Sequence, residues 1–257
     1  HEAKRSGAGI ELPCINKSNY MSTIYGKDIY LGFIHIMSLE YRIATIIEQV
    51  RNEGGPFTDL NDFVARVNPG LEQLILLIRA GALRFTMKKK ATLLWEAHML
   101  INKSKPEPMK QLFSSPSKKF VLPDLEHDRL DDAYDEIELL NFPVTMSWFD
   151  MLVTSFRGDV SVNEMIKYKG QKIRVVGHLV TIKYIRTIKK EWMNFGCFID
   201  PAGNYFDTTH FPQSLKNYPF KGAGTYLILG KVVEEFGYPS IEVEKMAKLA
   251  VKPDKRY

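Results

Sequence analysis

Two glycine-containing junctions between short helical patterns constrain this chain more than any other feature. At the first, Gly54 and Gly55 follow an apolar pattern of helical spacing, and Pro56 comes directly after them. Glycine adopts the left-handed backbone conformation that a helix end requires, and proline cannot continue a helix. Thr58 or Asp59 is then placed to cap a second short helix, because an oxygen-bearing side chain accepts hydrogen bonds from the first free N–H groups.

The second junction lies about ten residues beyond the new helix, where an apolar helical pattern ends at Ala80-Gly81-Ala82. Paired helix-hairpin-helix units have this layout: a helix, a glycine turn, a short helix and a further helix that ends at a glycine flanked by small residues. We therefore expect a mainly helical domain over residues 1–101. Its expected elements are a hairpin at 23–31 and helices near 39–52, 59–66, 70–80 and 88–101.

The middle of the chain, residues 102–158, is expected to be a linker. Residues 102–123 are rich in Lys, Ser and Pro and show little periodicity. Residues 130–140 predict an acidic helix, which Asn141 and Pro143 would end.

The periodicity changes to that of strands in residues 159–257. Alternating patterns predict strands at 173–181, 192–199, 205–211, 225–234 and 240–246, with a short helical connection at 212–218. Five short strands with a helix between the third and fourth are the order of an OB-fold barrel. The predicted fold class is therefore α+β and multidomain, with an all-α helix-hairpin-helix domain, a linker and a β-barrel.

Several segments, in this order and spacing, resemble the C-terminal half of the bacterial DNA polymerase III α subunit, and the resemblance covers nearly the whole chain. These segments are residues 2–18, 54–67, 78–83, 91–94, 136–143 and 170–177. The resemblance implies that the polymerase carboxylates lie upstream of this chain. It also implies single-stranded DNA, primer-template duplex, a sliding clamp and other replisome subunits as partners.

One hairpin departs from that family. The family's first hairpin carries a Lys-Gly-Val-Gly-like turn whose backbone N–H groups contact DNA phosphates, and the matching stretch here is Met37-Ser38-Leu39-Glu40. Both glycines are replaced, and Glu40 places a negative charge where a phosphate would approach. We expect this hairpin to contribute little to duplex binding.

Composition favours a cytoplasmic, nucleic-acid-compatible protein. The net charge is +5 with a pI of about 9.0, a modest basic excess that permits nucleic-acid binding without establishing it. Cys14 and Cys197 are the only cysteines, which argues against a disulfide framework. No apolar run is long enough to cross a membrane.

No catalytic constellation, metal site or cofactor fingerprint stands out, so we expect no catalytic residues, no metal and no cofactor. The richest carboxylate cluster lies beside the linker and is interpreted as a solvated acidic face rather than a metal site. Its members are Asp124, Glu126, His127, Asp128, Asp131 and Asp132. His210, near Asp207, is interpreted as an ordinary strand residue.

The strongest nucleic-acid signal lies in the predicted barrel. Cations and aromatic rings alternate there on the first strand, its loop and the start of the second strand, as non-specific single-strand binding requires. The candidates are Lys183, Tyr184, Arg186, Lys189, Lys190 and Trp192. We expect Phe198 to point into the core and Tyr184 and Trp192 to lie on the surface.

Two further segments are candidates. Lys88, Lys89 and Lys90 precede a predicted helix and would either meet phosphates or form a solvated loop. In the linker, Gln111 is followed by Leu112 and Phe113, an apolar pair that has no core to join unless a partner supplies one. This segment resembles the internal clamp-binding motif of the same family, although Met109 stands at its first position; the alternative is a local packing contact.

The sequence therefore predicts a non-catalytic C-terminal fragment of a replicative DNA polymerase that binds DNA and the sliding clamp. The alternative is a protein-interaction scaffold that docks replisome partners and binds little DNA.

Overall fold

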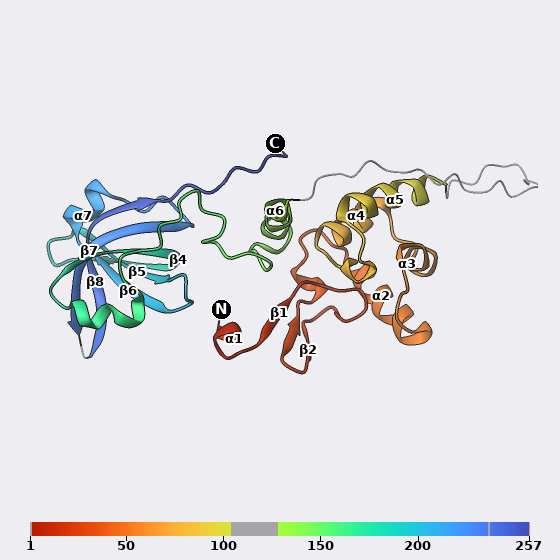
Figure 1. Ribbon diagram of the computed structural model, residues 1–257, viewed down its shortest axis with the longest axis horizontal. Coiled ribbons are helices and arrows are strands. Elements are labelled where there is room, and N and C mark those ends of the chain that lie inside the picture. Colours follow the sequence, from red (N-terminus) through yellow and green to blue (C-terminus); the bar gives the residue numbers. More distant parts are fainter. Residues whose placement is uncertain (1, 104–127, 236, 257) are drawn as a thin grey trace, which may run out of the picture. The chain divides into compact units, whose positions relative to one another are not determined.

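The computed structural model describes residues 2–103, 128–235 and 237–256, and Figure 1 shows their helices and strands. The chain divides into two compact units. The helical unit comprises His1–Thr145 with Asp254–Tyr257, and the barrel unit comprises Met146–Pro253. This division differs from the expected boundaries after residues 101 and 158, because the acidic helix belongs to the helical unit instead of a linker.

The helical unit contains the hairpin and the four helices that were predicted for it. Its elements are α1 (Glu2–Arg5), β1 (Gly9–Glu11), β2 (Thr23–Tyr25), β3 (Asp28–Tyr30), η1 (Phe33–His35), α2 (Tyr41–Gly54), α3 (Leu60–Val67), α4 (Leu71–Arg79), η2 (Arg84–Thr86), α5 (Lys90–Lys103) and α6 (Arg129–Leu140). Strands β2 and β3 are antiparallel and turn at Gly26, and β1 adds to β3 in parallel.

The first glycine junction has the predicted geometry. Helix α2 ends at Gly54, and Gly55 has a φ of 77°, in the left-handed region that favours glycine. The Asp59 side chain caps α3 by accepting a hydrogen bond from the Asp62 N–H. Arg66 on α3 reaches back and donates to the carbonyl oxygens of Val50 and Gly55, which ties α3 to the end of α2.

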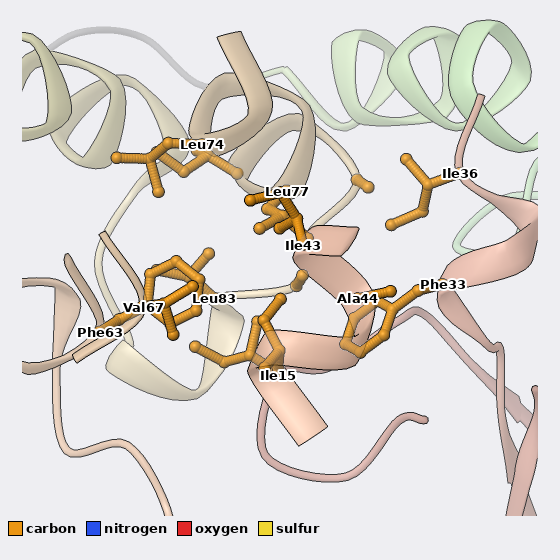
Figure 2. Packing of buried hydrophobic residues seen from close by; sticks show 14 of the residues in the cluster. Ile15, Phe33, Ile36, Ile43, Ala44, Phe63, Val67, Leu74, Leu77 and Leu83 are labelled. Atoms are coloured by element: carbon orange, nitrogen blue, oxygen red, sulfur yellow. The ribbon is translucent and has the colours of Figure 1, made fainter. Parts of the chain in front are cut away.

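Apolar side chains from these helices meet in one core. Figure 2 shows residues from α2, α3 and α4 and from the segments before and after them pointing toward one another. The labelled members are Ile15, Phe33, Ile36, Ile43, Ala44, Phe63, Val67, Leu74, Leu77 and Leu83. This burial, and not intrinsic helix propensity, holds such short helices in place.

The barrel unit is a closed five-stranded barrel with the strand order β4-β5-β6-β8-β7. Its elements are η3 (Val162–Tyr168), β4 (Lys172–Arg186), β5 (Trp192–Ile199), β6 (Tyr205–His210), α7 (Pro212–Asn217), β7 (Thr225–Glu235) and β8 (Tyr238–Lys248). Strands β6 and β8 are parallel and the other neighbours are antiparallel. This closed Greek-key order is that of an OB-fold, which confirms the predicted fold class.

The barrel interior is tightly filled. Phe198 is fully buried, as predicted, and its ring stacks on Phe206. A Cβ atom at Gly196 would lie 2.7 Å from the Phe198 ring and 2.8 Å from the Thr208 hydroxyl. Glycine is therefore the residue that fits between these side chains.

Among the described residues, no helix combines the length and the apolar character that crossing a membrane would need.

Candidate nucleic-acid interface

Strand β4 contacts a different neighbour along each half of its length. Residues 172–178 pair with β7, and residues 178–186 pair with β5. The second half of β4, the turn at 187–191 and the first half of β5 therefore form one hairpin, here called the β4–β5 hairpin. All six candidates from the barrel lie on it.

The strand register assigns the candidates to two faces. Arg186 is paired with Trp192, and Tyr184 with Asn194, so these side chains share one face of the hairpin. Asn194 is buried, so this face continues the interior surface of the barrel. Lys183 is paired with Phe195 and lies on the opposite face.

Arg186 and Trp192 are in direct contact. The guanidinium carbon of Arg186 lies 4.6 Å from the centroid of the Trp192 ring. Tyr184 is 62% exposed and Trp192 is 54% exposed, so the predicted surface positions are confirmed. Together the three side chains present a cation and two ring surfaces to solvent, the chemistry that contacts phosphates and bases.

A tight turn carries the other two cations. The Lys190 N–H donates to the Thr187 carbonyl oxygen at 2.8 Å, and the Thr187 N–H donates to the Glu191 carbonyl oxygen at 2.9 Å. Lys189 and Lys190 are exposed. In the part of the chain that the structure describes, no carboxylate forms an ion pair with Lys183, Lys189 or Lys190. Glu191 adds one negative charge to the same turn.

The lysine run before α5 is largely paired within the helical unit. Lys88 forms an ion pair with Glu96 at 2.7 Å, and Lys90 with Asp132 at 2.7 Å and Asp135 at 3.3 Å. Lys89 is exposed directly before α5. The pairing of Lys88 and Lys90 favours a structural role for this run over phosphate binding.

The acidic helix has a partly exposed side and a buried side. Asp128 caps α6 and, like Asp131 and Asp132, is partly exposed, whereas two carboxylates further along the helix are buried. Asp135 is 6% exposed and accepts from Arg79, Lys90 and Arg256.

The fully buried Glu136 accepts from the N–H groups of Val144 and Thr145 and from the Thr145 hydroxyl. Internal ion pairs and hydrogen bonds therefore hold the buried side of the acidic helix. Within the described residues, no group of three or more His, Cys, Asp or Glu side chains is arranged to hold a metal ion. Asp124, Glu126 and His127 lie outside those residues.

The clamp-motif residues Gln111, Leu112 and Phe113 also lie outside the described residues.

The turn at Met37-Ser38-Leu39-Glu40 contains one residue in a conformation that favours glycine. Ser38 has a φ of 62°, although serine rarely adopts that region. Glu40 is the residue before α2, its side chain makes no capping hydrogen bond and it is exposed. Its backbone N–H donates to the Gln73 side chain at 2.8 Å. The turn thus holds one residue, Ser38, in a left-handed conformation, and the charge of Glu40 disfavours an anion.

Sequence reasoning passed over Ile188, which lies fully exposed at the tip of the β4–β5 hairpin. The signal was present: a β-branched apolar residue stands between Thr187 and two lysines, in a turn where polar residues and glycine are usual.

Comparison with known proteins adds a family context. Residues 7–93 match the model of a helix-hairpin-helix motif family. The chain is 26% identical over 240 residues, 90% of its length, to a DNA polymerase III subunit alpha of Staphylococcus epidermidis, of which it covers 22%. It is 32% identical over 98 residues, 37% of its length, to an error-prone DNA polymerase of Mycobacterium tuberculosis, of which it covers 9%. The chain therefore spans less than a quarter of the length of these relatives.

Among solved structures, the single-stranded DNA binding protein of Thermus aquaticus is similar with a TM-score of 0.30 and 10% identity. That similarity covers 33% of this chain and 42% of the other.

Proposed function

We propose that this chain, a relative of the C-terminal region of bacterial DNA polymerase III α subunits, is a non-catalytic part of a replicative DNA polymerase that binds single-stranded DNA through its barrel. The whole enzyme would be a DNA-directed DNA polymerase, whose metal-binding carboxylates would lie elsewhere. No cofactor is assigned to the part described here.

The observation that carries this proposal is the β4–β5 hairpin. It presents the stacked Arg186–Trp192 pair, the exposed Tyr184 ring and two lysines at its turn. Cations neutralise phosphates and ring faces stack on bases without regard to sequence. This surface therefore suits a single strand whose bases are unpaired.

The alternative is a scaffold that docks replisome proteins. The altered turn at Ser38 and Glu40 favours that alternative for the helical unit, because the turn is exposed and carries a negative charge where a phosphate would bind. For the barrel unit, the unpaired lysines and exposed rings favour nucleic acid.

Salt dependence separates the two. The full chain is titrated with a fluorescent single-stranded oligonucleotide at several salt concentrations, and the anisotropy gives the affinity. If Arg186, Lys189 and Lys190 each neutralise a phosphate, the slope of log affinity against log salt is about −2, using ~0.7 per phosphate; a contribution from Lys183 moves it toward about −3.

The Lys189→Ala/Lys190→Ala variant should flatten that slope by about 1.4, because it removes two phosphate contacts. A matched control, Lys167→Ala/Lys216→Ala, removes the same charge from η3 and α7. Equal effects of the two double variants, or an affinity that ignores salt, would favour the scaffold.

Clamp binding through Gln111, Leu112 and Phe113 is a separate proposal. It rests on the sequence of the linker and on its resemblance to the family's internal clamp motif.

A further inference from the structure

We propose that Ile188 is an apolar wedge that inserts between neighbouring bases of the nucleic acid bound by the β4–β5 hairpin. Lys189 and Lys190 would hold the phosphates on either side of the opened step. The inference rests on the proposed function, since it assigns a role to the tip of the same hairpin.

Ile188 occupies a prominent position in the turn of the hairpin. It is the first residue of a three-residue loop, and its side chain is fully exposed. Two hydrogen bonds close the loop beneath it. The Lys190 N–H donates to the Thr187 carbonyl oxygen, and the Glu191 N–H donates to the Thr187 hydroxyl at 3.2 Å. The turn therefore projects Ile188 on a defined backbone.

Isoleucine is an unusual residue at this turn position. Turn positions favour Gly, Pro, Asn, Asp and Ser, and a β-branched apolar side chain gains nothing from full exposure to water. A scattered exposed apolar residue is ordinary, but this one occupies the tip of the hairpin that carries the cations and rings. Local rules are typically broken at functional sites.

Lys190, in the same loop, has an unusual backbone conformation. Lys190 has a φ of 63°, at the position where three-residue hairpin loops favour a glycine in the left-handed region. The chain thus holds a lysine where glycine would relieve backbone strain. Strain that persists at one residue points to a role for its side chain, and here that side chain is a cation two positions from Ile188.

The surroundings of Ile188 favour nucleic acid as its partner. Proteins that open base steps insert Ile, Leu, Met, Phe or Pro and hold the flanking backbone with Arg or Lys. A lysine-flanked apolar tip also suits an anionic membrane, but a single isoleucine buries too little apolar surface for stable membrane binding. The Arg186–Trp192 stack and Tyr184 on the same hairpin provide further contacts for bases, so nucleic acid is favoured.

The test uses the full chain and a single-stranded oligonucleotide that contains 2-aminopurine, whose fluorescence rises when its neighbours unstack. The unsubstituted chain should raise the fluorescence on binding. Ile188→Ser should abolish that rise and weaken binding by about tenfold, as expected for the loss of one buried aliphatic side chain. Ile188→Val, the matched control, should keep the rise, because it retains an apolar β-branched tip.

Lys190→Gly provides a second variant, since glycine fits the left-handed position. It should raise the unfolding temperature and lower the DNA affinity.

The outcomes separate the inference from the function. If Ile188→Ser binds DNA and raises the fluorescence like the unsubstituted chain, the wedge is wrong and the binding surface stands. If the unsubstituted chain does not bind the oligonucleotide, the proposed function fails and the wedge with it. If Ile188 is required for binding to phosphatidylserine vesicles and not to DNA, the tip is a membrane contact and the wedge is overturned.

Discussion

Arg186 stacks over the ring of Trp192 across the β4–β5 pair, with 4.6 Å between its guanidinium carbon and the ring centroid. Lysine lacks the planar guanidinium that lies over the ring in this contact. Arg186→Lys should therefore weaken single-strand binding several-fold at constant charge, with an unchanged salt slope.

Trp192→Ala should weaken single-strand binding by roughly 1–3 kcal/mol, the usual loss for one base–aromatic stack, and it should also leave the salt slope unchanged. Anisotropy titrations at several salt concentrations measure both quantities. A changed slope in Trp192→Ala would mean that the ring acts by placing Arg186 on its phosphate and not by stacking on a base.

The turn before α2 is expected to regain duplex binding when its glycines are restored. Ser38 already has a left-handed φ of 62°, and glycine is accepted at the position of Glu40 before a helix. Ser38→Gly/Glu40→Gly should therefore fold and bind a short duplex more tightly than the unsubstituted chain. Glu40→Gln serves as the control that removes only the charge. No gain in the double variant would show that this turn does not meet DNA.

Asp135 should be a main contributor to the stability of the helical unit. Asp135→Asn keeps the size of the side chain but leaves Arg79, Lys90 and Arg256 beside a neutral amide. We expect the free energy of unfolding to fall by about 3 kcal/mol, the range for breaking a buried pair from one side. Urea denaturation followed by circular dichroism measures this. The control Asp131→Asn on the same helix should change it by about 0.5 kcal/mol or less.

Acid should weaken the barrel unit through His210. Burial lowers the pKa of His210 to about 4 from 6.5, because a buried imidazolium loses its hydration. Between pH 6.5 and 4 the unfolded chain binds a proton that the folded chain does not, so stability is full above pH 6.5 and is lost as the pH falls toward 4.

The loss attributable to His210 is on the order of 3 kcal/mol. His178 contributes in the same direction, because burial and then Lys248 lower its pKa to about 4. Thermal unfolding of His210→Gln across this pH range should show a shallower decline than the unsubstituted chain. An identical decline would assign the acid sensitivity to other groups.

Clamp binding should depend on Leu112 and Phe113. Each apolar side chain that enters a groove contributes about 1.5–3 kcal/mol, less the cost of ordering the segment, so the affinity should be on the order of micromolar. Leu112→Ala/Phe113→Ala should abolish binding to a purified sliding clamp in calorimetry. Lys118→Ala/Lys119→Ala, in the same linker, is the matched control. Unchanged binding in the first variant would show that the motif assignment is wrong.

Most elements could be predicted because their signals are local. The capping Asp59, the left-handed Gly55 and the alternation along β4 each act within a few residues of the element they define. The same locality explains why the sequence predicts that Phe198 points into the core.

What could not be predicted depends on distant partners. The burial of Asp135 and Glu136 depends on groups outside the acidic helix, among them Arg256 and the N–H of Thr145. Likewise, the alternation predicts a first barrel strand that ends at residue 181, whereas β4 continues to Arg186 and so places Lys183 and Arg186 on opposite faces.

Beyond residue 178, β4 is paired with β5 on one side and, among the described strands, with none on the other. An open strand edge is a template on which a second copy of the chain can add its own strand, and charged side chains along it are a common defence. Lys183 and Arg186 stand on this edge, one on each face. The charges offered to a nucleic acid therefore also oppose strand addition at this edge, so substitutions that remove DNA binding should also lower a barrier to aggregation.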